Sequence, residues 1–264
     1  QKKKQFKGLE LKGKVLGVVG LGAIGIMVAN SAYDLGMSVY GYDPYLSVNR
    51  AWDLSRGVIP EDNIEKLFSE VDFISLHVPY TKNTADFVDE TLLSRINKNA
   101  CLLNFARGGI VDQTALLKAL DDNKLAHYVT DFPSKKLLNH PKVTSFPHLG
   151  ASTDEAEDNC ALMVADQIDS FLKFGNIKNS VNFPDCNVPL KKDLKRITVV
   201  NDNVPAVVSN ITSVIANKGH NIVELTNKSK ESLAYTMIDI DGEYSESLYN
   251  LLETIEGVKK VRFI

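Results

Sequence analysis

The stretch VVGLGAIG, residues 18–25, places three glycines in the spacing Gly20-x-Gly22-x-x-Gly25 directly behind a short apolar run. This spacing is typical of a turn from a buried strand into a helix, where a dinucleotide approaches the backbone closely. The same glycines also fit an ordinary tight strand-to-helix turn. The residues around the motif must therefore decide between a ligand site and a plain turn.

The residues on both sides of the glycines follow the order of a dinucleotide-binding unit. The run KVLGVVG, residues 14–20, is rich in β-branched residues and predicts a buried parallel strand. A helix is expected to begin inside the motif, because residues recur at helical spacing at Ile24, Met27, Val28, Ser31 and Leu35. The next strand-like run, SVYGYD, ends at Asp43, where such folds place a carboxylate for the adenosine ribose. This order favours a dinucleotide, and the carboxylate favours NAD because it would repel the 2′-phosphate of NADP.

Each glycine has an expected role in such a site. Gly20 permits the turn, Gly22 lets the backbone approach the pyrophosphate, and Gly25 lets the helix pack closely on the strand. Backbone amides and the positive end of the helix would then face the phosphates.

Strand-like and helical segments continue to alternate up to about residue 150. Further strands are predicted at 71–79, 100–109, 125–132 and 142–150, with a helix at Gln113–Leu120. This order predicts an α/β fold with a Rossmann-type doubly wound parallel sheet, whose ligands lie outside the carboxyl ends of the strands. Polar residues stand at those ends, namely His77, Arg107, Asp131 and His148. His77, beside Pro79, fits a structural turn as well as a cofactor contact.

The pattern changes after residues 183–194, a segment with two prolines and mixed charge that we interpret as a linker. Beyond it, strands are predicted at 196–200, 221–229, 233–241 and 258–264. Two helices are expected between them, with apolar faces formed by Val207, Ile211, Val214, Ile215, Leu248, Leu251, Leu252 and Ile255. The order βαββαβ predicts a small ferredoxin-like domain at residues 195–264.

Composition and charge exclude several classes of protein. The 264 residues carry a net charge of −3, so no overall basic field favours nucleic acid. No apolar run reaches the roughly 18 residues of a membrane-spanning helix, so no membrane association is expected. The three cysteines, Cys101, Cys160 and Cys186, match neither a zinc site nor a disulfide framework. We expect reduced thiols in a cytoplasmic protein, with no metal site.

Five motifs in order carry a resemblance to a known family: GKVLGVVGLGAIG, YGYDPY, LHVP, NFARGGIVDQTAL and PHLGAST. Across residues 8–182 the chain resembles the D-2-hydroxyacid dehydrogenases, and within them the enzymes that oxidise 3-phosphoglycerate. The resemblance implies NAD-dependent oxidation of 3-phosphoglycerate to 3-phosphohydroxypyruvate, the first step of serine biosynthesis. It also implies a homodimer or homotetramer, and an NAD-binding domain at residues 1–182 whose return helix, 152–174, lies at the dimer interface.

The resemblance also implies roles for the polar residues at the strand ends. The Arg of the ARGG motif binds the substrate carboxylate in the family, and here it would be Arg107. The His of PHLGAST takes the hydroxyl proton and would be His148, while the Asp of VTDF contacts the nicotinamide carboxamide and would be Asp131. A planar guanidinium and an imidazole suit these tasks. The full set expected to contact NAD is Gly20, Gly22, Ala23, Ile24, Gly25, Asp43, Pro44, His77, Val78, Pro79, Thr84, Ala106, Arg107, Asp131 and His148.

Two features depart from the family pattern. The family pairs its His with a Glu that orients the imidazole, whereas no carboxylate stands between Asp131 and His148. Either another group plays that part or the pair is incomplete. Family members also carry a substrate-domain segment before the linker that FKGLELKGKV resembles, and this sequence opens instead with QKKKQF, without an initiator methionine or signal-peptide pattern. We therefore expect a fragment or processed chain that binds NAD but does not turn over substrate alone.

The second half resembles an ACT domain of the kind attached to such dehydrogenases. The match is carried by NDNVPAVVSNITSVIANKGHNIVELTNKS, residues 201–229. In those domains, amides and Asn side chains between paired modules hold an amino acid, generally L-serine, and the matching positions are Asn201, Asn203 and Asn221. The Gly usual after the loop Pro is Ala206 here, which would crowd a ligand near the backbone. These Asn residues also suit turn formation and helix capping.

Two other functions stay open on the sequence alone. A different NAD-dependent D-2-hydroxyacid dehydrogenase would keep every feature of the nucleotide site and differ in a substrate pocket outside this sequence. A non-catalytic NAD-sensing module would tolerate the absence of the Glu, but it would not require both Arg107 and His148.

Overall fold

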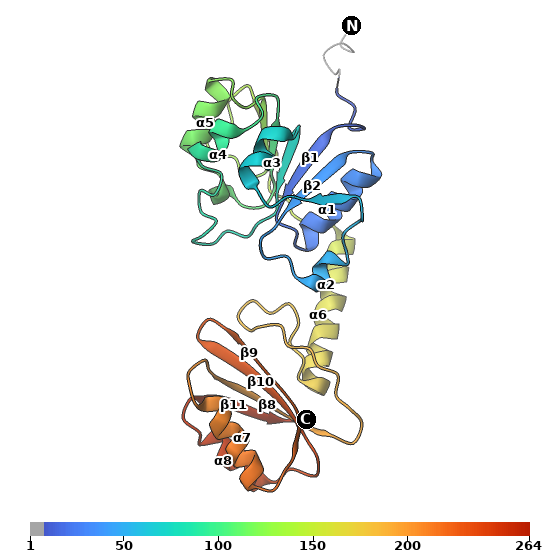
Figure 1. The fold of residues 1–264 in the computed structure, drawn as a ribbon, viewed down its shortest axis with the longest axis vertical. Helices are drawn as coiled ribbons and strands as arrows, with labels where there is room; N and C mark the ends of the chain where they lie inside the picture. The colour runs from blue at the N-terminus through green and yellow to red at the C-terminus, as the bar shows by residue number, and fades with distance from the viewer. Residues whose placement is uncertain (1–7) are drawn as a thin grey trace. The chain divides into compact units, whose positions relative to one another are not determined.

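The computed structural model describes residues 8–264. The chain forms two compact units, one that ends at Gly150 and one that runs from Ala151 to Ile264 (Figure 1). The opening segment QKKKQF, on which the expectation of a fragment partly rests, lies outside the described residues.

The described part of the first unit is built on a seven-stranded parallel sheet (Figure 1). Its strands are β1 Val15–Val19, β2 Ser38–Tyr42, β3 Val58–Pro60, β4 Phe73–Leu76, β5 Cys101–Asn104, β6 His127–Thr130 and β7 Val143–Ser145. Their order across the sheet is β3-β2-β1-β4-β5-β6-β7, so the chain winds outward in both directions from the middle. The predicted doubly wound fold is confirmed.

Helices cover both faces of this sheet. They are α1 Ala23–Asp34, α2 Val48–Ala51, α3 Ile64–Glu70, α4 Glu90–Arg95, the short 3₁₀ helix η2 Gly108–Ile110, and α5 Gln113–Asp121. Successive residues of a strand point to opposite faces, so Val18 packs in an apolar cluster with Ile26 of α1. Its neighbour Val19 packs in a second cluster with Phe68 of α3 and Leu116 of α5. Both faces of β1 are therefore buried, as a near-continuous apolar strand requires.

Short polar side chains cap the N-termini of three of these helices. Asn63, Asp89 and Asp112 stand before α3, α4 and α5, and each accepts a hydrogen bond from a backbone amide of the first turn. Those amides have no partner within the helix, so the caps explain where each helix begins.

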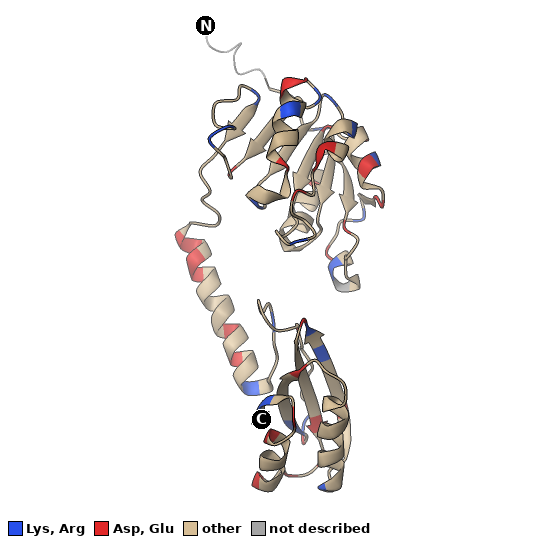
Figure 2. Cartoon of the chain, turned by 90° about the vertical axis from the view of Figure 1, so that its left-hand side faces the viewer, with Lys and Arg blue, Asp and Glu red and all other residues tan. Residues whose placement is uncertain are grey.

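The second unit opens with a long helix, α6 (Asp154–Phe174). Thr153 caps its first turn by accepting a hydrogen bond from the amide of Ala156, and Gly175 ends it with a φ of +69°. Acidic residues gather in the first turn and Lys173 stands in the last, which suits the helix dipole (Figure 2). Within residues 8–264 no residue of α6 is buried, and its exposed apolar residues are Leu162, Met163, Val164, Ile168, Phe171, Leu172 and Phe174.

The rest of the second unit contains a four-stranded antiparallel sheet with two helices, counted over the described residues (Figure 1). Its elements are β8 Lys195–Asp202, α7 Val207–Asn217, β9 Ile222–Lys230, β10 Leu233–Ile240, α8 Glu246–Glu253 and β11 Val258–Phe263. The strand order β11-β8-β10-β9 and the chain order βαββαβ confirm the predicted ferredoxin-like fold. Apolar residues of α7 and α8, such as Ile211 and Leu252, form one core with β8 and β10.

A buried ion pair ties this sheet to the segments before it. Arg196 in β8 is 0% exposed, and its guanidinium donates hydrogen bonds to both carboxylate oxygens of Asp239 at 2.6 and 2.7 Å. The same guanidinium donates to the backbone carbonyls of Phe174, Val188 and Pro189. One side chain therefore joins the end of α6, the linker and β10.

The loop before α7 holds a strained residue. Ala206 has a φ of +72°, the left-handed region in which a side chain costs roughly 1–2 kcal/mol. We expect Ala206→Gly to raise the free energy of unfolding of the second unit by about 0.5–1 kcal/mol, after the added flexibility of the unfolded chain is subtracted. Urea denaturation measures this change. Ala216→Gly, at an exposed position near the end of α7, is the matched control and should lower stability instead. Destabilisation by both variants would contradict the strain argument.

Candidate functional site

Two of the three motif glycines are required by close packing. Gly20 has a φ of +92°, and a Cβ added there would lie 2.8 Å from the backbone carbonyl of His77. A Cβ at Gly25 would lie 1.9 Å from the carbonyl oxygen of Gly20. No other residue fits at either position, so these two glycines bring α1 against the ends of β1 and β4.

Gly22 is different, because a Cβ added there would meet nothing within 4 Å. Packing within the chain therefore does not explain this glycine, whereas a ligand that approaches the backbone would. Helix α1 begins directly after it, so the amides of Ala23 and Ile24 belong to the first turn and have no partner within the helix. Open space beside unpaired amides suits a phosphate group.

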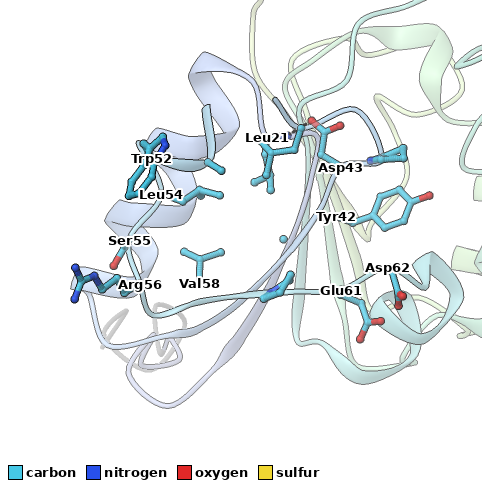
Figure 3. A pocket seen from close by; sticks show the side chains of 15 residues that line it. Leu21, Tyr42, Asp43, Trp52, Leu54, Ser55, Arg56, Val58, Glu61 and Asp62 are labelled. Carbon is cyan, nitrogen blue, oxygen red and sulfur yellow. Dashed lines mark hydrogen bonds between the residues drawn. The ribbon is translucent and has the colours of Figure 1, made fainter. Parts of the chain in front are cut away.

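Asp43, directly after β2, lines a cavity of about 890 Å³ (Figure 3). Its carboxylate accepts hydrogen bonds from the backbone amides of Leu21 and Tyr45, both at 2.8 Å, so it is held from two sides. Pro44 lines the same cavity, and Trp52 lies across it from Asp43 (Figure 3). The cavity is large enough for a nucleoside, with a fixed carboxylate on one wall.

His77 follows β4 and is held by contacts of its own. Its Nε2 lies 2.8 Å from the hydroxyl oxygen of Ser75, and burial lowers the pKa of the imidazole below its ordinary value. Val78 and Pro79 lead into a loop that Thr84 closes by donating a hydrogen bond from Oγ1 to the carbonyl of Pro79 at 2.5 Å. These contacts account for His77 as a structural residue, and its contact with a cofactor stays a prediction.

Arg107 follows β5 in a turn that a buried side chain holds. The amide nitrogen Nδ2 of Asn104 donates to the carbonyl of Arg107 at 2.9 Å, and its Oδ1 accepts from the amide of Ala106 at 3.1 Å. Arg107 itself is exposed, and its guanidinium donates to the carbonyl of Ala106 at 2.6 Å. Sequence reasoning missed Asn104, although an Asn at the end of an apolar strand was the available signal.

His148 is in direct contact with Asp131. Nδ1 of His148 lies 2.8 Å from Oδ2 of Asp131, and the ring of Phe132 stacks against the imidazole at 4.5 Å between centroids. The pair forms because β6 and β7 are adjacent parallel strands whose carboxyl ends meet. Among the described residues, the carboxylate that contacts the His148 imidazole is that of Asp131.

The second oxygen of that carboxylate is unsatisfied. Oδ1 of Asp131 is buried and has no hydrogen-bond partner among the described residues. A buried acceptor without a donor is costly, so a ligand that offers an N–H there would be favoured. The site thus combines an oriented imidazole with a buried hydrogen-bond acceptor, Oδ1 of Asp131, that has no donor among the described residues.

The three Asn residues predicted to bind an effector do not come together within one chain. Asn201 is buried and accepts a hydrogen bond from the hydroxyl of Thr236, and Asn203 donates to the carbonyl of Glu231. Both lie near the start of β10, whereas Asn221 lies beside Asp241 at its end. A site that used all three would need two copies of the unit.

Within residues 8–264 no group of three or more His, Cys, Asp or Glu side chains could hold a metal ion. No helix in this range is long and apolar enough to cross a membrane. The three cysteines form no disulfide there.

Comparison with known proteins places this geometry in context. Residues 1–150 match the family model described as D-isomer specific 2-hydroxyacid dehydrogenase, NAD binding domain. The D-3-phosphoglycerate dehydrogenase of Methanocaldococcus jannaschii is 41% identical over 196 residues, which cover 72% of this chain and 37% of that protein. The enzyme of the same name from Haemophilus influenzae is 30% identical over 268 residues, which cover 97% of this chain and 64% of that protein. The chain therefore spans less than two thirds of the length of either relative.

Solved structures agree with these matches. An NAD⁺-bound 3-phosphoglycerate dehydrogenase from Entamoeba histolytica superposes with a TM-score of 0.57 at 32% identity, over 67% of this chain and 57% of that one. The holo form of D-mandelate dehydrogenase from Rhodotorula graminis gives a TM-score of 0.56 at 31% identity, over 62% of this chain and 49% of that one.

Proposed function

The chain belongs to the D-isomer specific 2-hydroxyacid dehydrogenase family, and from this premise we propose that it is part of an NAD-dependent enzyme that oxidises 3-phosphoglycerate to 3-phosphohydroxypyruvate. Relatives named D-3-phosphoglycerate dehydrogenase support this substrate, and the match to one of them extends over 97% of the chain. The proposed catalytic role of this chain rests on the 2.8 Å hydrogen bond between His148 and Asp131.

In the proposed oxidation, His148 removes the proton from the substrate hydroxyl. Its Nδ1–H points at Oδ2 of Asp131, so Nε2 keeps the lone pair that accepts the proton. The carboxylate of Asp131 then stabilises the imidazolium that results. NAD⁺, when bound, would supply the acceptor for the hydride that the substrate carbon gives up.

Arg107 is proposed to hold the substrate carboxylate. Its exposed guanidinium can donate two parallel hydrogen bonds to a carboxylate, and Asn104 fixes the backbone that carries it. The bond from the guanidinium to the carbonyl of Ala106 would be exchanged for the substrate.

The residues of the first unit fit NAD at three points. Open space at Gly22 faces the start of α1, where the pyrophosphate would lie. Asp43 is held in place for the ribose hydroxyls and would repel a 2′-phosphate. The buried Oδ1 of Asp131 is a suitable acceptor for the carboxamide of nicotinamide. One carboxylate would then orient the base with one oxygen and the cofactor with the other.

The ferredoxin-like unit is proposed to be an ACT-type regulatory domain that binds L-serine between two copies. The separation of Asn221 from Asn201 and Asn203 supports this, because only a pair of modules could bring all three to one ligand. The proposal requires a homodimer or homotetramer. A cytoplasmic location in serine biosynthesis is proposed with it, supported by the absence of a disulfide among the described residues.

The test is NADH oxidation with 3-phosphohydroxypyruvate, with and without L-serine, on protein expressed from the complete reading frame. We expect turnover that falls when serine is added. Turnover unaffected by serine would remove the regulatory proposal and leave the dehydrogenase. Turnover with other 2-oxo acids alone would contradict the substrate, and NAD binding without any turnover would favour a sensor.

A further inference from the structure

Trp52 is the only tryptophan of the chain and stands at the end of α2, on the wall of the 890 Å³ cavity. The residue is 83% exposed, an unusual state for the largest apolar side chain. We propose that the indole of Trp52 is the platform on which the adenine base of the dinucleotide stacks. This inference rests on the proposed NAD-dependent function and adds a specific adenine-binding residue to it.

The backbone that follows Trp52 is fixed by one side chain of α1. The amide nitrogen of Asn30 donates to the carbonyl of Asp53 at 2.8 Å, and its oxygen accepts from the amide of Ser55 at 2.8 Å. Leu54, between these two residues, packs against the apolar cluster beneath α1. The segment directly after Trp52 is therefore held in place while its ring stays exposed, as a preformed binding surface requires.

The opposite wall places a nucleoside within reach of this ring. Asp43 lies across the cavity from Trp52 (Figure 3), and its carboxylate is held by two backbone amides. A ribose whose hydroxyls bind Asp43 carries its base on the adjacent carbon, so the base must extend into the cavity. Val58 and Leu54 also line the cavity, so the base would meet an apolar surface.

The chemistry of the two groups matches. A purine and an indole are both flat and polarisable, and aromatic platforms hold bases by stacking without reading their edges. Of the four charged side chains that line the cavity, Asp43, Glu61 and Asp62 are acidic and Arg56 is basic, so the net negative charge does not favour a second phosphate. Tyr45 and Val48 are also strongly exposed nearby, at 89% and 76%, but they do not line the cavity. These exposed neighbours favour a competing explanation, in which Trp52 contacts another protein.

The test uses fluorescence of the 264-residue chain, in which Trp52 is the single tryptophan reporter. Titration with NAD⁺ or ADP should quench its emission saturably, whereas nicotinamide mononucleotide, which lacks adenine, should not. By calorimetry, Trp52→Ala should raise the Kd of NAD⁺ about 10-fold and Trp52→Phe about 3-fold. Val48→Ala is the matched control, since it shortens an exposed apolar side chain of α2 outside the cavity lining, and its Kd should equal that of the wild type.

The outcomes separate this inference from the function on which it rests. If the wild-type chain binds no NAD⁺, the proposed function fails at the cofactor. If NAD⁺ binds and Trp52→Ala leaves the Kd unchanged, the stacking role is overturned and the protein-contact explanation takes its place. Equal loss of affinity in Trp52→Ala and Val48→Ala would also overturn it. Circular dichroism of the variants should match the wild type, because the exposed ring contributes little to the core.

Discussion

Replacing Asp131 by Asn is expected to lower kcat for the proposed oxidation of 3-phosphoglycerate by about 10³- to 10⁴-fold, measured on protein expressed from the complete reading frame. Oδ2 of Asp131 now accepts the Nδ1 hydrogen of His148 at 2.8 Å, which leaves Nε2 free to accept a proton. An Asn at this position can present an N–H instead, and the imidazole would then carry its hydrogen on Nε2. It could not act as a base in that form, nor would a carboxylate stabilise its protonated state.

The size of the change in NAD⁺ affinity, compared with the change in kcat, distinguishes this role from a purely structural one. The amide oxygen of Asn can still accept a hydrogen bond from the nicotinamide carboxamide, so the Kd of NAD⁺ should change far less than kcat. Asp121→Asn is the matched control, because Asp121 pairs with His140 at 3.2 Å on the surface, and its kcat should be unchanged. A variant that lost NAD⁺ binding but kept kcat at saturation would show that Asp131 serves the cofactor alone.

The features that could be predicted from sequence are those with local signals. The run before Gly20 and the run that ends at Asp43 predicted β1 and β2, because buried parallel strands read as continuous β-branched segments. The ferredoxin-like unit followed from the alternation of strand and helix patterns. Strand β3, at Val58–Pro60, and helix α2, at Val48–Ala51, were not predicted, since three or four residues are too few to show a period.

Contacts between distant residues could not be predicted, because they depend on which strands become neighbours. His148 and Asp131 are 17 residues apart and meet only because β7 pairs with β6. Arg196 and Asp239 are 43 residues apart and face each other through the register of β8 with β10. A charged residue in a strand gives no local sign that it will be buried. The two pairs on which the strongest predictions rest were therefore visible only in the structure.

Replacing Arg196 by Ala is expected to destabilise the second unit by about 3–5 kcal/mol. The change leaves the carboxylate of Asp239, which is 2% exposed, without its partner in the core. It also removes the donor to the carbonyls of Phe174, Val188 and Pro189. Urea denaturation followed by circular dichroism measures the loss. NAD⁺ binding should persist, because Arg196 and all of these partners lie outside the first unit.

A double variant separates the ion pair from the other bonds of the guanidinium. Arg196→Met with Asp239→Leu removes both charges, so the unpaired carboxylate disappears and much of the lost stability should return. Recovery should stay incomplete, because three carbonyls remain without donors and each costs about 1–3 kcal/mol if it stays buried. Lys173→Ala, which breaks the exposed pair with Asp169, should change stability by less than about 1 kcal/mol. Full recovery in the double variant would mean that the carbonyl contacts of Arg196 contribute nothing. The link from α6 to the sheet would then rest on its other contacts, such as the hydrogen bonds from Arg262 to the carbonyls of Phe171 and Leu172.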